Sequence, residues 1–345
     1  MGEDSVLGFH LVGILAFSLS TQIFFFLATL VLSGFDPLVS VSQGFVGSHV
    51  ARLLIAEGCE VHALVRENGE QWRIQDILPS LHLWQSDLVA FETVNAYLQK
   101  IKPELCIHLA WYVGSGKQLN SRENLNSFQA SLNLFSQLAE VGCKRFVGIG
   151  TCFEYDFNLG YFSESSPTKP ITLYAATKVA LFTILQQLAQ SAEVELTWVR
   201  LFYQYGPMED ERRLIPSVIC SLLRDEVVKT TKGEQVLDFL HVEDIASAIW
   251  AVAKSNVSGV VNVGSGQPVT VGQIALELGN LLGKPDLIHL GALPYRPNDP
   301  MFICANNELL RKKTDWTPKY NLTTGLKNTI EWYKDHLNIK KIEEI

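Results

Sequence analysis

Short apolar segments alternate with longer helical segments along most of this chain, and the alternation limits the fold more than any other feature. A chain in which each strand is followed by a helix forms a parallel sheet with helices on both faces. The pattern therefore predicts an α/β protein with a Rossmann-type, doubly wound parallel sheet. The expected strands are Leu38–Val41, Glu60–Val65, His82–Gln85, Leu105–Ala110, Arg145–Ile149 and Glu195–Phe202, and the expected helices include Ser48–Glu57 and Asn124–Val141.

The chain is expected to contain three segments. Residues 1–35 form an apolar amino-terminal segment, and residues 36–205 form an NAD(P)-binding Rossmann domain. Beyond Tyr205-Gly206-Pro207 the spacing of strands and helices loosens. This change predicts a smaller α/β substrate-binding domain over residues 206–345, interleaved with the first. The chain has 345 residues, of which 47% are hydrophobic and 19% are charged, and this composition suits an enzyme with a sizeable core.

Charge and cysteine content argue against several classes of partner. The formal net charge of −8 argues against nucleic acid. The six cysteines include no CxxC pair, and the eight histidines do not cluster, so no metal site is expected. Buried free thiols in a reducing compartment are the simplest interpretation of these cysteines.

The amino-terminal segment is unusually apolar. Between Ser5 and Phe35 there is no Asp, Glu, Lys or Arg, and this stretch exceeds the roughly 20 residues that cross a bilayer. It could form a single-pass membrane anchor, with membrane contact through residues 5–35 and a cytoplasmic catalytic domain, since Arg52 and Arg66 follow it. An acidic start without a clear cleavage site argues against a secretory signal. The alternatives are a buried apolar helix, or a start assigned too far upstream so that these residues are not native.

A glycine-containing turn joins the first strand to the first helix of the Rossmann segment. In Gly44-Phe45-Val46-Gly47 the glycines would let backbone N–H groups approach a pyrophosphate at the helix N-terminus. A complete fingerprint has a third glycine where this chain has Val41. An ordinary strand–helix turn is therefore the alternative to a cofactor turn.

The ends of the second and third strands carry further candidates for cofactor binding. Arg66 follows the second strand and could pair with a 2′-phosphate, which favours NADP(H) over NAD(H). A solvated loop arginine is the alternative, so NAD(H) stays open. Asp87 and Leu88 follow the third strand and could touch an adenine ring, whereas a helix cap is the plainer role for Asp87.

Tyr174 and Lys178 are four residues apart in a predicted helix, so both side chains lie on one face. An ammonium beside a phenol favours the phenolate. Thr151, at the end of the fifth expected strand, could hydrogen-bond a substrate oxygen that Tyr174 protonates or deprotonates. This arrangement predicts general acid–base chemistry on an alcohol/ketone pair.

These residues resemble the extended short-chain dehydrogenase/reductase family, especially its nucleotide-sugar epimerases, dehydratases and 4-ketoreductases. The resemblance runs from about Leu38 to Tyr333 and rests on the order and spacing of many short motifs. They are Gly44-Phe45-Val46-Gly47-Ser48-His49, His108-Leu109-Ala110, Thr151 with Tyr155, Glu164-x-x-Pro167-x-x-Pro170 before Tyr174 and Lys178, Arg200, Tyr205-Gly206-Pro207, Asp238-Phe239, His241-Val242-Glu243-Asp244, Asn262-Val263-Gly264-Ser265-Gly266, Arg296, Trp316 and Pro318.

The resemblance implies a role for each candidate residue. Tyr174 is the acid/base, Lys178 lowers its pKa and holds the nicotinamide ribose, and Thr151 positions the sugar oxygen. Leu109 and Ala110 pass beside the nicotinamide. Arg296 contacts the substrate diphosphate, with a surface ion pair as the alternative. Trp111 and Tyr112 line the sugar pocket, with core packing as the alternative.

Several positions depart from the family pattern. Cys152 and Phe153 stand where dehydratases of this group carry Asp and Glu, which argues against dehydration. Tyr203 and Leu237 replace an Asn and an Arg that usually help to hold the nucleotide diphosphate, so Tyr203 is expected in an altered substrate site. Ser127 takes the place of an Asn that supports the active-site helix.

The expected activity is an NAD(P)-dependent reductase or epimerase that acts on a sugar hydroxyl or ketone, at C4 of a nucleotide-linked hexose. The alternative is a catalytically silent nucleotide- or sugar-binding protein of the same fold, tethered to a membrane. The resemblance also implies a homodimer formed through two helices.

Overall fold

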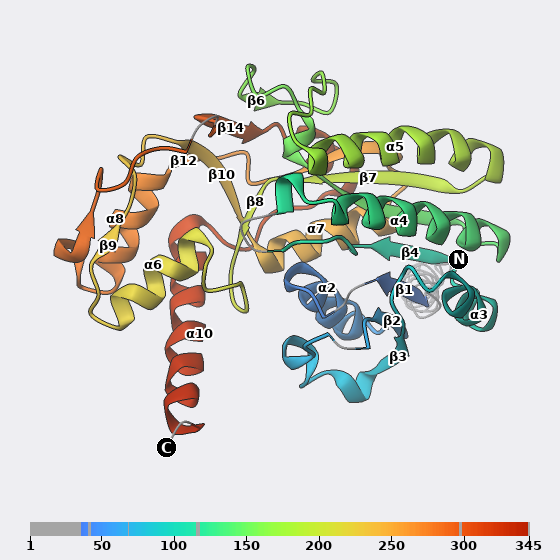
Figure 1. Ribbon diagram of the computed structural model, residues 1–345, viewed down its shortest axis with the longest axis horizontal. Coiled ribbons are helices and arrows are strands. Elements are labelled where there is room, and N and C mark those ends of the chain that lie inside the picture. Colours follow the sequence, from blue (N-terminus) through green and yellow to red (C-terminus); the bar gives the residue numbers. More distant parts are fainter. Residues whose placement is uncertain (1–35, 41–42, 68, 115–117, 297–298, 344–345) are drawn as a thin grey trace, which may run out of the picture.

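A parallel sheet forms the centre of the molecule. The computed structural model describes residues 36–343 except 41–42, 68, 115–117 and 297–298. Within this part of the chain the sheet has seven strands in the order β11-β7-β5-β4-β1-β2-β3 (Figure 1). Its strands are β1 (Pro37–Ser40), β2 (Val61–Val65), β3 (Leu81–Gln85), β4 (Leu105–His108), β5 (Arg145–Thr151), β7 (Glu195–Leu201) and β11 (Gly259–Val263).

The three central strands are buried along their whole length, as apolar runs covered on both faces require. Every residue of β1, β4 and β5 is buried. Each neighbouring pair in the sheet runs parallel. The expected Rossmann-type, doubly wound sheet is therefore confirmed.

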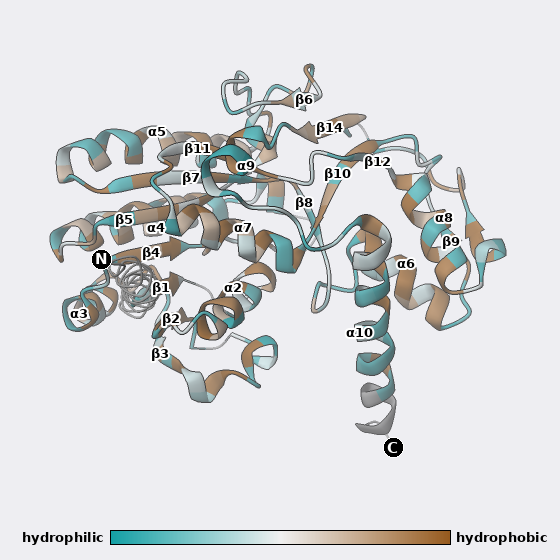
Figure 2. Cartoon of the chain, turned by 180° about the vertical axis from the view of Figure 1, so that it is seen from behind, coloured by the Kyte–Doolittle hydropathy of each residue, from teal (hydrophilic) through white to brown (hydrophobic). Residues whose placement is uncertain are grey.

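Helices cover both faces of this sheet. In Figure 2, which views the molecule from behind, α2 (Phe45–Ala56) and α7 (Val242–Lys254) lie in front of the strands. Their apolar residues share one core with β1, β2 and β11. The other face is covered by α3 (Phe91–Ile101), α4 (Glu123–Glu140) and α5 (Leu173–Ala192), which share a second core with the sheet. Figure 1 shows α4 and α5 side by side on this face.

A smaller unit lies at the carboxyl edge of the central sheet. Its sheet has the order β12-β10-β14-β6, with β8 also paired to β10, and it has a core of its own. The elements are β6 (Tyr161–Phe162), β8 (Tyr203–Tyr205), α6 (Leu214–Leu223), β9 (Val228–Lys229), β10 (Val236–His241), β12 (Pro268–Thr270), α8 (Val271–Leu281), β13 (Ile288–His289), β14 (Phe302–Ala305) and α10 (Leu322–Glu343). Helix α9 (Glu308–Thr314) follows β14 but packs against β11 and α7 of the central unit.

The chain passes between the two units more than once. After β10 it returns through α7 to β11, which pairs with β7 at the edge of the central sheet. The expected division at residue 206 stays a prediction.

Most differences from the expected element bounds concern one or two end residues, but two of them bear on the site. The helix after the glycine turn begins at Phe45, directly after Gly44, and not at Ser48. Strand β5 continues past Ile149 to Thr151, because its pairing with β7 extends to Thr151 opposite Leu201. The first strand begins at Pro37, where a strand tolerates a residue without an N–H.

Some predictions concern residues that the structure does not describe. The apolar segment 1–35 and Val41 lie outside the described residues. No helix within the described residues has the length and hydropathy of a membrane span. The same residues contain no group of three or more His, Cys, Asp and Glu side chains that could hold a metal ion. All six cysteines are buried and free.

Candidate active site

Helix α5 carries Tyr174 and Lys178 one turn apart. Its first turn is fixed by two side chains that accept hydrogen bonds from backbone N–H groups. Thr172 Oγ1 accepts from Ala175 at 3.2 Å, and Asn120 Oδ1 accepts from Leu173 at 3.1 Å. Tyr174 therefore lies in a rigid helix N-terminus.

Thr151 meets Tyr174 at the carboxyl end of β5. Thr151 lies close enough to the Tyr174 phenol to lower its pKa. Thr151 is buried, and its Oγ1 also accepts a hydrogen bond from the Phe153 N–H at 3.3 Å. Because that N–H occupies one acceptor position, the Thr151 hydroxyl proton is left to donate to a phenol oxygen or to a substrate oxygen.

Burial dominates the titration of Tyr174. It raises the pKa of the phenol well above its ordinary value, and the hydrogen bond from Thr151 acts in the opposite direction. The Arg213 guanidinium, which is exposed at the start of α6, also lowers this pKa. Sequence reasoning expected Lys178 to lower the pKa of Tyr174. In this structure the pKa is raised, because partial burial of the phenol disfavours its charged form.

Lys178 is held away from solvent by the strand and by an indole ring. Its Nζ donates to the backbone oxygen of Ile149 at 2.6 Å, and lies 3.7 Å from the centroid of the Trp111 ring. Burial lowers the pKa of Lys178 to about 7, and the charge of Glu154 raises it. Near neutral pH the ammonium is therefore only partly charged, which weakens its effect on Tyr174.

Trp111 joins the predicted pocket residues to the catalytic candidates. Its ring lies 6.3 Å from the Tyr174 ring in an edge-on arrangement, and its Nε1 donates to Asn124 Oδ1 at 2.8 Å. The neighbouring Tyr112 N–H donates to Ser127 Oγ at 3.1 Å. Ser127, which replaces the family's Asn, thus still supports the loop after β4.

The glycine turn and the end of β2 are joined by a residue that the sequence reasoning missed. Gln43 is buried beside the turn, and its Oε1 accepts the Arg66 backbone N–H at 3.1 Å. Its Nε2 is buried and has no hydrogen-bond partner among the described residues. Gly44, Phe45, Val46 and Gly47 follow it as the start of α2. The structure thus places Arg66 next to the turn.

The other cofactor candidates have well-defined backbone contacts. Leu109 and Ala110 donate their N–H groups to Ser40 Oγ at 3.0 and 3.2 Å, which holds this loop against β1. Asp87 Oδ1 accepts the Val89 N–H at 3.1 Å in a local turn. The expected alternative of a helix cap is not what the structure shows, because the N-cap of α3 is Ala90 and no side chain caps it. Leu88 packs against the core under α3 and α4.

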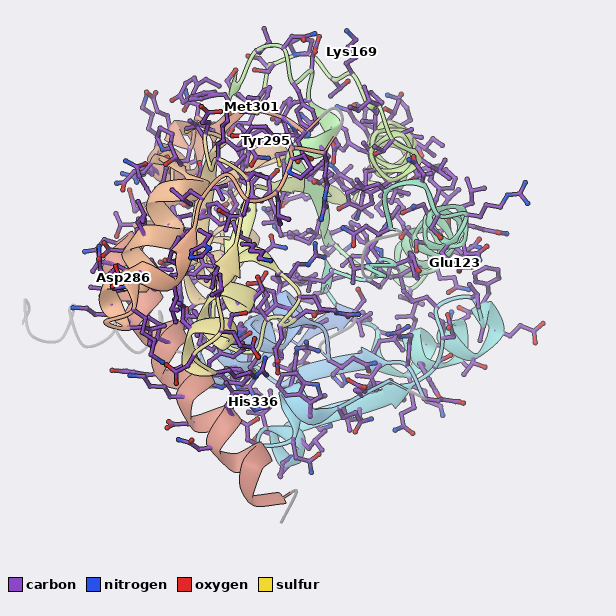
Figure 3. All side chains as sticks on the ribbon, turned by 60° about the vertical axis from the view of Figure 1, so that its left-hand side comes forward. Glu123, Lys169, Asp286, Tyr295, Met301 and His336 are labelled. Atoms are coloured by element: carbon purple, nitrogen blue, oxygen red, sulfur yellow. The ribbon has the colours of Figure 1, made fainter. Side chains whose placement is uncertain are left out.

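Two substrate candidates lie in the smaller unit. Tyr203 in β8 packs between the rings of Phe153 and Phe239, and burial raises the pKa of its phenol. Arg296 is exposed, and its backbone oxygen accepts the Asp299 N–H at 3.2 Å. Figure 3 labels Tyr295 and Met301 on either side of this segment, in the upper part of the view. Among the described contacts, none joins the Arg296 side chain to Tyr174.

Glycine is required inside β5 by the indole of Trp198. A Cβ added at Gly148 would lie 2.6 Å from two carbon atoms of that ring, and Trp198 is fully buried. We expect Gly148→Ala to lower the free energy of unfolding by about 2 kcal/mol, as measured by urea denaturation. Adding Trp198→Phe should recover part of this loss, whereas strictly additive losses would contradict the predicted steric conflict.

Comparison with known proteins agrees with this arrangement. The NAD dependent epimerase/dehydratase family matches residues 39–264. A UDP-glucuronate 4-epimerase from Thermodesulfobacterium geofontis is 25% identical over 317 residues, which cover 88% of this chain and 98% of that protein. A dTDP-6-deoxy-L-talose 4-dehydrogenase (NAD(+)) from Aggregatibacter actinomycetemcomitans is 25% identical over 277 residues, with 77% of this chain and 97% of that protein covered.

A solved structure also resembles the whole architecture. The crystal structure of UDP-glucose 4-epimerase from Thermotoga maritima with UDP-glucose has a TM-score of 0.80 and 25% sequence identity. The match covers 88% of this chain and all of that chain, 100%. The expected resemblance is thereby confirmed, and so is the expectation of an NAD(P)-dependent enzyme. The chain belongs to the NAD dependent epimerase/dehydratase family, among the extended short-chain dehydrogenase/reductase enzymes.

Proposed function

We propose that this protein is an NAD(P)-dependent reductase or epimerase that acts at C4 of a nucleotide-linked hexose. Tyr174 is the general acid/base, Thr151 positions the substrate oxygen, and Lys178 tunes Tyr174. The observation that carries the proposal is that Thr151, Tyr174 and Lys178 come together at the carboxyl end of β5, where Thr151 affects the pKa of Tyr174 and Lys178 donates to the backbone oxygen of Ile149. Ligands of doubly wound sheets bind at such strand ends.

The raised pKa of Tyr174 suits one half of the reaction. A phenol that stays protonated at neutral pH can donate its proton to a sugar ketone oxygen as that oxygen gains charge. The Thr151 hydroxyl donates a second hydrogen bond to the same oxygen and holds it in place. The nicotinamide supplies or accepts the hydride when it is bound. In the reverse direction, removal of the sugar hydroxyl proton requires Tyr174 to be ionised.

The described residues fit a dinucleotide. The first turn of α2 has backbone N–H groups that the helix itself does not pair, and Gly44 and Gly47, which carry no side chain, would let a pyrophosphate approach them. The Gln43 amide beside this turn has a buried N–H₂ group that no described residue pairs with, and it can donate to a ribose or phosphate oxygen. Arg66 follows, which favours NADP(H). Lys178 would face the nicotinamide ribose, beside Trp111.

The activities of the relatives include both reaction types that the proposal leaves open. One relative is a 4-epimerase and another is a 4-dehydrogenase, and each name places the reaction at C4 of a nucleotide-linked sugar. A catalytically silent binding protein is disfavoured, because Thr151, Tyr174 and Lys178 are all retained in hydrogen-bonded or buried positions. Glu154 is buried and paired with Arg200, so it does not replace the missing acids of a dehydratase.

Substrate contacts through Trp111, Tyr112, Tyr203 and Arg296 are part of this proposal. A basic side chain such as Arg296 would pair with the diphosphate of the substrate. The homodimer, the cytoplasmic location of the catalytic part and the membrane contact of residues 5–35 stay predictions.

The proposal is tested by incubating the purified protein with NADPH or NADH and a panel of nucleotide 4-keto sugars, and separately with UDP-hexoses. A reductase will consume reduced cofactor in proportion to sugar, as measured by absorbance at the nicotinamide band. An epimerase will interconvert C4 epimers without net consumption, as measured by NMR. Binding of cofactor without turnover of any sugar would favour the silent alternative and overturn the proposal.

A further inference from the structure

A carboxylate with no exposed surface lies directly behind Thr151. Glu154 ends the short helix η4 (Cys152–Glu154), and its side chain is 0% exposed. Its Oε1 accepts the backbone N–H of Thr151 at 2.9 Å. The Thr151 side chain in turn accepts from the Phe153 N–H, so both ends of this turn are fixed by reciprocal hydrogen bonds.

The rest of the Glu154 carboxylate is fixed to the neighbouring strand β7. The Trp198 Nε1 donates to both oxygens, at 3.0 and 3.2 Å, and Arg200 Nε donates to Oε2 at 2.7 Å. A side chain at Gly150 would meet Glu154 Oε1 at 2.5 Å. The absence of a side chain at Gly150 is therefore what lets the carboxylate reach Thr151.

A buried carboxylate is costly to the fold unless its charge and its lone pairs are satisfied. Here Arg200 balances the charge, and the Arg200 guanidinium lies 4.4 Å from the centroid of the Tyr155 ring. A packed apolar pair could fill the same space at lower cost. Unlike an apolar pair, however, the Glu154 carboxylate can accept a hydrogen bond from the backbone N–H of Thr151, the residue next to Tyr174.

We propose that Glu154 is a positioning residue, which sets the place of the Thr151 hydroxyl relative to Tyr174 by linking the Thr151 backbone to Trp198 and Arg200 of β7. This inference rests on the proposed function. Glu154 does not touch the substrate oxygen; it acts through Thr151. A displacement of the hydroxyl by about 1 Å is enough to reduce turnover by about a hundredfold.

The test uses Glu154→Gln, which keeps the shape but turns an N–H₂ group toward donors that need an acceptor. We expect kcat to fall by roughly 10- to 100-fold, while KM for the sugar and the dissociation constant of NADPH change by less than about threefold. In a Thr151→Ala background the same substitution should reduce kcat by less than about threefold, because the residue through which it acts is already lost.

A second substitution keeps the inference testable where glutamine prevents folding. Glu154→Asp retains the charge opposite Arg200 but withdraws the oxygens from the Thr151 N–H, and it should show the same dependence on Thr151. The matched control is Glu164→Gln. Glu164 also accepts a backbone N–H, that of Asn262 at 3.0 Å, but it does not contact Thr151. Its effect on kcat should be the same with threonine or alanine at position 151.

The outcomes separate the two proposals. Wild-type kcat in Glu154→Gln, or a loss that simply multiplies with that of Thr151→Ala, would overturn the positioning role and leave the proposed function intact. Equal losses in kcat, sugar affinity and cofactor affinity would show a merely structural role. An inactive wild-type enzyme would overturn the proposed function, and the positioning inference with it.

Discussion

Replacing Tyr174 by phenylalanine is expected to lower kcat by about 10²- to 10⁴-fold, because the variant keeps the ring but removes the group that transfers the proton. The ring contact with Trp111 is retained, so the free energy of unfolding should change little. Binding of NADPH, measured by fluorescence titration, should also be close to that of the wild type. The loss should therefore appear in kcat and not in cofactor affinity.

Tyr161→Phe is the matched control for this variant. Tyr161 is 52% exposed in β6 and has no contact with the catalytic candidates among the described residues. Its replacement should leave kcat within about twofold of the wild type. If Tyr174→Phe behaved in the same way, the phenol would not be the acid/base and the proposed mechanism would have to be abandoned.

Replacing Lys178 by methionine should affect activity and stability in opposite directions. Burial lowers the pKa of Lys178 to about 7, so the ammonium that would assist Tyr174 is present below this pH and is lost above it. In the wild type, kcat/KM for the cofactor, which reports groups of the free enzyme, should fall as the pH rises through 7. Lys178→Met should lower kcat/KM by about 10²-fold and remove this pH dependence.

The stability effect follows from the same pKa by linkage. The unfolded chain binds a proton at Lys178 up to its ordinary pKa near 10.4, whereas the folded protein releases that proton near 7. The unfolded state therefore binds more protons between pH 7 and 10, and stability rises with pH across this window. Below pH 7 the buried charge has its full cost, so Lys178→Met should stabilise the fold at pH 6 by about 1–3 kcal/mol.

Urea denaturation at pH 6 and pH 10 measures this effect. Lys312→Met is the control, since Lys312 is exposed and pairs only with Glu308 on the same helix. It should leave both the kinetics and the slope of stability against pH unchanged. Destabilisation by Lys178→Met at pH 6 would mean that the hydrogen bond to Ile149 outweighs the cost of burying the charge.

The sequence predicted the strands and helices around the site better than the side-chain contacts within it. Apolar runs and their spacing were enough to place β5, α5 and the glycine turn, because these depend on local patterns. The bonds that hold the site depend on partners distant in the chain. Glu154 meets Arg200 and Trp198 from another strand, and no periodicity points to such a contact.

Lys178 shows why residue identity and spacing alone gave the wrong direction for the pKa shift of Tyr174. Its spacing from Tyr174 suggested a charged neighbour, but the structure buries the ammonium under Trp111 and against the backbone of Ile149. Desolvation then raises the pKa of the phenol and lowers that of the amine, and the extent of desolvation is set by packing. At Asp87 the sequence suggested a helix cap, whereas its carboxylate closes a local turn with the Val89 N–H ahead of α3.

The return of the chain from β10 through α7 to β11 has a consequence for how the molecule can be divided. A fragment that stopped at Tyr205 would leave β7 with an open edge and would strip α7 from the apolar face shared with α2. The unit built on the central sheet is thus completed only by residues made later in synthesis. Both units should melt in one cooperative step, and we expect neither to fold as an autonomous module.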